Sequence, residues 1–145
     1  MASVQNEYSL LCRQFDSDWA ELSAIEDMPL LAFSPLATGL LTGKYRGDTT
    51  PAGSRRTLNA DLSGRATPAA HAAVDAYLAI AAKHGLDPAQ MAIAFCRTRP
   101  YPNIPIIGAT SLAQLETNIG AAEITLSPEA LADIAATWRA HPMPY

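Results

Sequence analysis

Charged residues, basic runs and long hydrophobic runs are all scarce in this chain of 145 residues. Only 17% of the residues are charged, against the usual quarter, while 49% are apolar. This composition is globular and excludes an extended disordered chain. Ten Lys and Arg against fourteen Asp and Glu leave a net charge of −4. We therefore expect neither a nucleic-acid backbone nor an anionic membrane surface as a partner.

No segment has the pattern of a membrane span or a signal peptide. The longest mostly apolar stretch, 28–41, is interrupted by Pro29, Ser34, Pro35 and Gly39, and it is too short to cross a bilayer. The first six residues have neither a basic region nor a hydrophobic one. These absences predict a cytoplasmic protein that forms one domain or a piece of one.

Cysteine and histidine are too few and too scattered to suggest a metal site. Cys12 and Cys96 form no motif, and they can be either one disulfide or two buried thiols; a reducing cytoplasm favours the thiols. The three histidines, at positions 71, 84 and 141, lack the spacing of metal ligands. No trio of residues suggests nucleophilic catalysis, so we expect neither a metal nor a catalytic triad.

The hydrophobic pattern predicts three short strands separated by helices. The expected strands are Ser3–Tyr8, Leu30–Phe33 and a buried strand over 104–107. The first expected helix is Asp18–Glu26, with Asp18 and Glu21 as a capping box. The second is His71–His84, which Gly85 ends. Three more helices are expected to begin after Asp87, Ser111 and Ser127. Strands alternating with helices imply an α/β fold with a parallel sheet. Three strands are few for such a sheet, which suggests part of a larger fold.

A long irregular segment, 36–68, separates the second strand from the next helix. It contains five of the eight glycines and no sustained periodicity. A segment this long inside a domain is either disordered or functional. Its first part, 36–45, is too apolar for a disordered linker, which favours a loop that packs against the rest of the molecule.

Two places in the pattern are candidate ligand sites, each with a structural alternative. The turn Gly108–Ser111 lies between a strand and a helix N-terminus, which suits a phosphate; otherwise it is an ordinary turn with a serine cap. Gln114 can close a capping box with Ser111 or point at a ligand. Phe33, at a strand end, can stack on a flat ring or pack locally. Three loop cations can face an anion or only solvent: Lys44, Arg55 and Arg56.

Three segments in order resemble the aldo-keto reductases, in particular the bacterial oxidoreductases akin to potassium-channel β subunits. They are Val4-Gln5-Asn6-Glu7-Tyr8-Ser9, then Phe33-Ser34-Pro35-Leu36-Ala37-Thr38-Gly39-Leu40-Leu41-Thr42-Gly43-Lys44-Tyr45, then Ile104-Pro105-Ile106-Ile107-Gly108-Ala109-Thr110-Ser111 continuing to Gln114, Leu115 and Asn118. The resemblance implies a (β/α)8 TIM barrel that binds NADP(H) and reduces carbonyls. Residues 1–145 would be its C-terminal part, strands six to eight with their helices, and 36–68 would be the long cofactor loop.

The same resemblance implies a cofactor site. Gln5 would bond the nicotinamide carboxamide, and Phe33 would stack on the ring where the family usually has Tyr or Trp. Ser34, Leu36, Thr38 and Gly39 would line the pyrophosphate, Lys44 and Arg55 would reach the adenosine phosphates, Gly108, Thr110 and Gln114 would hold the 2′-phosphate end, and Asn118 the adenine. Some members have Lys at the position of Gly108, Arg at that of Gln114 and Glu at that of Thr117, so the preference for NADP over NAD is weaker here.

The catalytic Asp, Tyr, Lys and His of the resembling family lie in the first half of its barrel and have no counterpart here. Tyr8, Lys44 and His71 occupy other motifs, and no catalytic residue is assigned. Because a small barrel needs about eight strands to close, three strands leave open edges that could drive self-association. We expect the NADP(H)-binding portion of a reductase, which would meet a carbonyl substrate only with the missing half. The alternative is a non-catalytic nucleotide-binding, regulatory or partner module.

Overall fold

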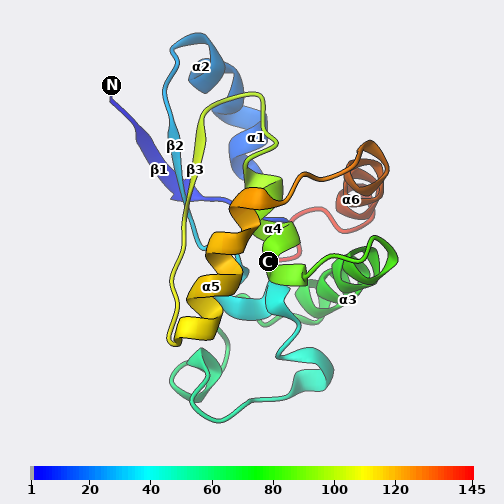
Figure 1. The fold of residues 1–145 in the computed structure, drawn as a ribbon. Helices are drawn as coiled ribbons and strands as arrows, with labels where there is room; N and C mark the ends of the chain where they lie inside the picture. The colour runs from blue at the N-terminus through cyan, green and yellow to red at the C-terminus, as the bar shows by residue number, and fades with distance from the viewer. Residues whose placement is uncertain (1) are drawn as a thin grey trace.

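The computed structural model describes residues 2–145, apart from the side chain of Asp18. The described residues form a three-stranded parallel sheet in the order β1-β2-β3, with β1 at Val4–Glu7, β2 at Leu30–Phe33 and β3 at Asn103–Ile106. Helices α1, α3, α4 and α6 lie on one side of the sheet, to its right in Figure 1. The predicted α/β fold with a parallel sheet is therefore confirmed.

Six α-helices are described. Their bounds are α1 Gln14–Asp18, α2 Ala20–Ile25, α3 Pro68–Lys83, α4 Pro88–Cys96, α5 Leu112–Gly120 and α6 Pro128–Ala140. The four longer helices begin at a side-chain cap: Thr67, Asp87, Ser111 and Ser127 each accept a hydrogen bond from the amide three residues on. In three of them a proline takes the first helical position, where its missing amide is harmless.

Two predicted helix starts are wrong. The first helical segment begins at Gln14 rather than Asp18 and breaks at Trp19, which separates α1 from α2 without a side-chain cap; the expected cap by the Asp18 side chain lies outside the described atoms. Helix α3 begins at Pro68 rather than His71, because Thr67 caps it by accepting from the amide of Ala70 at 3.0 Å. Gly85 follows the end of α3 with φ +65°, as expected of a residue that ends a helix.

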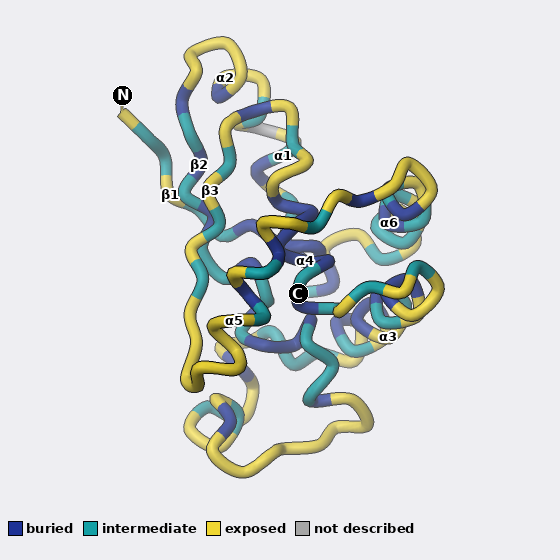
Figure 2. Tube along the Cα trace, in the orientation of Figure 1, coloured by how far each residue is buried: buried dark blue, intermediate teal, exposed yellow. Residues whose placement is uncertain are grey.

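The core lies between the sheet and the helices. Alternation along each strand turns Val4, Leu30 and Ala32 toward the helices, and Leu30 and Ala32 are fully buried. Helix α4 is buried on nearly all sides and lies at the centre of the molecule (Figure 2). Tyr8 and Phe95 stack in this core with ring centroids 6.2 Å apart.

The other side of the sheet is open, and it corrects the expectation of a buried third strand. Ile104 is 52% exposed and Ile106 is 42% exposed. They share this side with the exposed Gln5 and the half-buried Leu31 and Phe33. We call these five residues the open face. The prediction failed because an apolar sequence indicates only that burial of a strand is favourable. Within residues 2–145, no segment packs on this side of the strand and buries it.

Segment 36–68 packs against the core, as its apolar first part predicted. It contains three short 3₁₀ helices, η1 at Ala37–Thr42, η2 at Arg46–Asp48 and η3 at Arg55–Thr57. Leu40, Leu41, Tyr45 and Leu62 are all buried. In Figure 1 the segment extends past the ends of the strands at the bottom of the view. The loop is thus an ordered structure at the C-terminal edge of the sheet.

Candidate functional site at the C-terminal edge of the sheet

The segments that carry the predicted site residues meet at one edge of the sheet. Glu7, Phe33 and Ile106 are directly paired across the three parallel strands. The chain therefore leaves β1, β2 and β3 at the same edge, where ligands bind in parallel α/β folds. The turn after Phe33 and the turn around Gly108 follow neighbouring strand ends. This edge is the candidate site.

Gln5 and Phe33 lie on the open face. Gln5 pairs with Leu31 in the register, and Phe33 follows two residues later on β2. Phe33 is half-buried and is not among the apolar residues packed on the core cluster. The stacking role of Phe33 stays a prediction, and its position at the strand end on the open face is compatible with it. The amide of Gln5 offers both a donor and an acceptor beside it.

The turn after β2 has an unusual backbone. Ser34, Ala37 and Thr38 have positive φ of 54°, 46° and 57° without being glycine, and Gly39 follows at 99°. Strained backbone of this kind clusters at functional sites. Leu36 has φ −98° and ψ 11°, and Ala37 follows with a positive φ; a change of hand between successive residues is typical of concave anion sites. Among residues 2–145 the amides of Leu36 and Thr38 make no backbone hydrogen bond.

Lys44 covers this turn. A Cβ on Gly39 would lie 2.8 Å from Lys44 Cε and 3.0 Å from Lys44 Nζ, so the lysine side chain passes directly over the glycine. Lys44 Nζ is also 5.1 Å from the ring centre of Tyr45. The 3₁₀ helix η1 turns the chain back so that Lys44 returns to the residues just after β2. Two amides without a backbone partner and an ammonium thus lie in the same turn, and these groups suit a phosphate or pyrophosphate.

The turn between β3 and α5 is organised by side-chain hydrogen bonds. Gln114 Oε1 accepts from Thr110 N at 3.0 Å and from Thr110 Oγ1 at 3.1 Å, and Ser111 Oγ accepts from Gln114 N. Gln114 therefore makes a cap-like contact, with Thr110 N instead of Ser111 N, and its role toward a ligand stays a prediction. Asn118 is buried and donates to Gly108 O at 3.2 Å. The four predicted residues of this turn thus form two hydrogen-bonded pairs, Thr110 with Gln114 and Gly108 with Asn118.

The two loop arginines, Arg55 and Arg56, differ in their contacts. Arg55 is exposed. Arg56 instead binds within the loop, where it donates to Asp48, to Thr49 O at 3.1 Å and to Ala60 O at 3.1 Å. The pKa of the Asp48 carboxyl is lowered chiefly by its hydrogen bond to Arg56. Arg56 therefore shapes the loop, whereas the Arg55 side chain has no hydrogen-bond or ion-pair partner among residues 2–145.

One polar cluster at this edge was not predicted from the sequence. Arg65 donates to both carboxylate oxygens of Glu7, at 2.9 and 2.6 Å. Tyr145 Oη donates to Glu7 Oε1 at 3.0 Å, and Thr67 Oγ1 donates to Pro144 O at 2.7 Å. The end of β1, the end of the long loop and the C-terminal residues are thereby tied together. No local signal could have found this cluster, because 58 residues separate Glu7 from Arg65.

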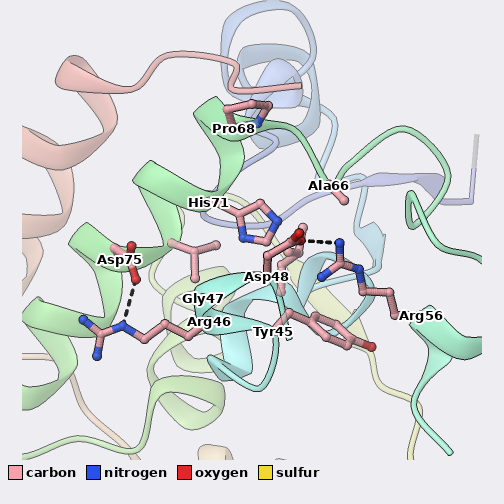
Figure 3. Close-up of a pocket in the computed structure, with 11 residues that line it drawn as sticks. Tyr45, Arg46, Gly47, Asp48, Arg56, Ala66, Pro68, His71 and Asp75 are labelled. Carbon is pink, nitrogen blue, oxygen red and sulfur yellow. Dashed lines mark hydrogen bonds and ion pairs between the residues drawn. The ribbon is translucent and has the colours of Figure 1, made fainter. Parts of the chain in front are cut away.

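A separate cavity of about 600 Å³ lies between the long loop and the start of α3 (Figure 3). The ion pair of Arg46 with Asp75 and that of Arg56 with Asp48 both lie in its wall. The predicted site residues do not line this cavity. It is therefore distinct from the candidate site at the sheet edge.

Tyr8 has a structural role. It is fully buried, and its hydroxyl donates to Asp16 Oδ1 and Oδ2 at 2.9 and 3.0 Å. Burial, and then the charge of Asp16, raise the pKa of Tyr8 far above its ordinary value. A general acid needs a pKa nearer neutrality and access to its substrate. Tyr8 thus remains outside the candidate site.

The described part of the chain has neither a metal-binding cluster nor a helix that could span a membrane. Among residues 2–145, no group of three or more His, Cys, Asp and Glu side chains is placed to hold a metal ion. Within the same residues, none of the helices combines the length and apolar character that crossing a bilayer requires. Cys12 and Cys96 are both free thiols, and Cys96 is buried while Cys12 is half-buried.

A family model and two related sequences place the chain in the same protein family. The family model for the aldo/keto reductase family matches residues 1–139. The Tas protein of Escherichia coli is 44% identical over 144 residues, which cover 99% of this chain and 42% of that protein. A probable voltage-gated potassium channel subunit beta of rice is 34% identical, covering 95% of this chain and 44% of the rice protein.

A solved structure has the same fold. The glycerol dehydrogenase of Gluconobacter oxydans superposes with a TM-score of 0.77 at 24% identity, covering 99% of this chain and 44% of that one. The chain thus spans less than half the length of the relatives it matches. The match over residues 1–139 and the identity with Tas show that the chain belongs to the aldo/keto reductase family.

Proposed function

We propose that this chain is the NADP(H)-binding portion of an aldo/keto reductase, made of strands six to eight of the barrel. The parent reaction is the reduction of an aldehyde or ketone, for which NADPH supplies the hydride. The observation that carries the proposal is the position of Lys44 over the left-handed turn at Gly39, directly after the strand that ends in Phe33.

The residues present fit a dinucleotide in three places. Two amides without a backbone partner and Lys44 lie at the turn after β2, which suits the pyrophosphate. Phe33 and Gln5 lie nearby on the open face, where a nicotinamide can stack and bond its carboxamide. The nine-residue helix α5 begins just after Thr110, which suits the phosphate of the adenosine end.

Few positively charged side chains are placed to distinguish NADP from NAD by its 2′-phosphate. The first turn of α5 contains no basic residue, and Gln114 is engaged with Thr110. We propose that Arg55 supplies the main positive charge toward the 2′-phosphate from the long loop. NADPH should therefore bind more tightly than NADH, and Arg55→Ala should reduce that difference more than it reduces binding of NADH.

A calorimetric titration of the purified chain with NADPH tests the proposal. Lys44→Gln should weaken binding at least tenfold, because the ammonium faces the pyrophosphate. Arg46→Gln is the matched control: it removes a cation two residues away that pairs with Asp75 outside the site. No binding by a folded chain, or equal losses in the two variants, would contradict the proposal.

A second candidate function is a nucleotide-binding regulatory or partner module. The likeness to a probable potassium channel subunit beta of rice supports it. The test combines the chain with the rest of a reductase barrel and measures both NADPH binding and carbonyl reduction. Binding without carbonyl reduction would favour this candidate over the enzyme.

A further inference from the structure

We propose that the cavity between the long loop and the start of α3 is a second ligand site, and that its ligand is a small carboxylic acid bound as the anion. The carboxylate lies against Arg56 and His71, and an apolar body lies against the apolar part of the lining. The cavity volume, about 600 Å³, is in the usual range of small-molecule sites. Binding here does not require the cofactor, and the tests are run without nucleotide.

Part of the cavity lining is apolar. Leu40 and Tyr45 from the long loop and Val74 from α3 are all buried, and they line the cavity together with Ala66 and Pro68. Small-molecule sites typically combine such apolar side chains with a few polar groups that orient the ligand. The ligand therefore has an apolar body of modest size.

Two polar atoms of the lining are buried without a partner. Among residues 2–145, His71 Nε2 and Tyr45 Oη are closed to solvent and make no hydrogen bond. Buried polar atoms in folded proteins are nearly always hydrogen-bonded. An imidazole nitrogen and a phenol hydroxyl can each donate to an oxygen atom. His71, on the first turns of α3, is thus an orienting group for a ligand oxygen.

Arg56 supplies the buried positive charge of the cavity. Its side chain is only 13% exposed. Three of its N–H groups are used by Asp48, Thr49 O and Ala60 O, and these bonds hold the guanidinium in the wall. A guanidinium has five N–H groups, so two are left for a ligand within residues 2–145. A planar fork of this kind matches the geometry of a carboxylate.

The negative charges of the lining lie further out. The side chain of Asp48 is 78% exposed, and that of Asp75, which pairs with Arg46, is mostly exposed. Figure 3 shows the Asp48 carboxylate turned toward Arg56, with the His71 ring beside it. The pKa of Asp48 is lowered chiefly by Arg56 and to a smaller extent by the charge of His71. Because water screens the outer carboxylates, the inside of the cavity favours an anion.

One short segment separates the cavity from the candidate site at the sheet edge. Leu40 lines the cavity, while Gly39, the residue before it, lies under Lys44. A Cβ on Gly39 would also lie 3.4 Å from Tyr45 Cε2, and Tyr45 lines the cavity. Within residues 2–145, the lining includes neither Gly39 nor Lys44. A carboxylate has two places to bind in this region, and the variants must distinguish them.

A titration with benzoate, followed by two-dimensional NMR of the amide groups, tests the proposal. Benzoate combines a carboxylate with a flat apolar body, and benzamide has nearly the same shape without the charge. Benzoate should shift the amide signals of 45–48 and 66–75, and benzamide should bind at least fivefold more weakly. A folded chain that binds neither probe, or binds both equally, would overturn the proposal.

Matched variants locate the bound carboxylate. His71→Leu and Arg56→Gln should each weaken benzoate binding at least fivefold, whereas His141→Leu, which removes an imidazole outside the lining, should leave it unchanged. Lys44→Gln should also leave it unchanged. If Lys44→Gln weakens binding as much as His71→Leu does, benzoate binds at the turn after β2 and the proposal is wrong.

Asp48→Asn should act in the opposite direction. Asn keeps the size of the side chain and tolerates the positive φ of 61° at this position, but it removes the negative charge beside Arg56 and His71. Benzoate should therefore bind at least threefold more tightly. A cavity that takes a cation, or that needs only an intact loop, would instead bind its ligand more weakly in this variant. Unchanged or weaker benzoate binding would overturn the assignment of an anion.

Discussion

Arg65 donates two hydrogen bonds, of 2.9 and 2.6 Å, to the carboxylate of Glu7, which lies 58 residues earlier in the chain. Both side chains are only 16% exposed. The hydrogen bond to Glu7 raises the pKa of Arg65 above its ordinary value. Two-pronged pairs of this kind are among the stronger polar contacts in proteins. The pair is therefore well placed to hold the long loop and the C-terminal residues against the end of β1.

Glu7→Gln should loosen this cluster. The amide cannot accept both bonds from Arg65, and the free energy of unfolding should fall by about 1–2 kcal/mol. Hydrogen exchange should quicken at the amides of 62–67 and 141–145. Asp75→Asn is the control, since its pair with Arg46 is mostly exposed. The assigned role of Glu7 fails if both variants alter exchange in these segments equally.

Gly39→Ala should impair NADPH binding through Lys44. The added Cβ would come within 2.8 Å of Lys44 Cε, so the lysine must move off the turn. Gly53→Ala provides the control, because Gly53 also has a positive φ, of 69°, but has open space around it. Both variants share the backbone strain of a left-handed alanine, about 1 kcal/mol. Calorimetry should show a loss of affinity of fivefold or more in Gly39→Ala alone.

Asp16→Asn should be strongly destabilising. Asp16 accepts from Tyr8 and Tyr101 and pairs with Arg13 at 2.9 Å and Arg99 at 3.2 Å. Removing the charge leaves two largely buried guanidinium groups without their carboxylate, at a cost of about 2–4 kcal/mol. Tyr77→Phe loses a single bond, to Leu10 O, and should cost about 1 kcal/mol. Urea unfolding of the two variants distinguishes a charged hub from an ordinary buried bond.

Asp133 should make stability depend on acid pH. Hydrogen bonds from Lys83 and then His84 lower the pKa of Asp133 below its ordinary value. The contribution of Asp133 to the free energy of unfolding is therefore complete above the ordinary aspartate pKa, about 3.9. It is lost as the pH falls through the lower pKa that Asp133 has in the folded chain. Asp133→Asn should unfold at lower urea than the parent at pH 7, and the difference should shrink as the pH falls below that ordinary value. A difference that stays constant as the pH falls would refute this assignment.

The two thiols should differ in reactivity. Burial raises the pKa of Cys96 to about 12, and the side chain is fully buried. Because the thiolate is the reactive form, Cys96 should resist iodoacetamide at pH 8 until the chain unfolds. The half-buried Cys12 should be alkylated first, as mass spectrometry of timed samples can show. Equal labelling rates in the folded chain would contradict the burial of Cys96.

Local signals predicted most of the fold. The caps Asp87, Ser111 and Ser127 each start a helix where the sequence indicated, because a cap is defined by residues within one turn. Thr67 was missed beside Pro68 although it has the same form. The start at Gln14 was missed because Arg13 supplies no cap for it.

The candidate site was less predictable, since it depends on distant segments and backbone conformation. The motif predicted that residues after Phe33 bind a ligand. The left-handed turn and the approach of Lys44 to Gly39 are visible only in the folded structure. Arg56 and Arg55 are adjacent in sequence, and only the fold shows that Arg56 binds Asp48 while Arg55 remains exposed. The exposure of Ile104 depends on which strands are absent from the described chain, which no local pattern encodes.

The strand order β1-β2-β3 follows the order of the chain, and this has a consequence for how the molecule folds. Pairing Val4 with Leu30 closes a segment of 26 residues, whereas pairing Leu30 with Asn103 closes one of 73. The longer closure costs about 0.9 kcal/mol more in chain entropy, before α3 and α4 form between its ends. We expect the β1–α1–α2–β2 unit to gain protection first in pulse-labelling hydrogen exchange, and β3 to dock last, onto a strand already held in place.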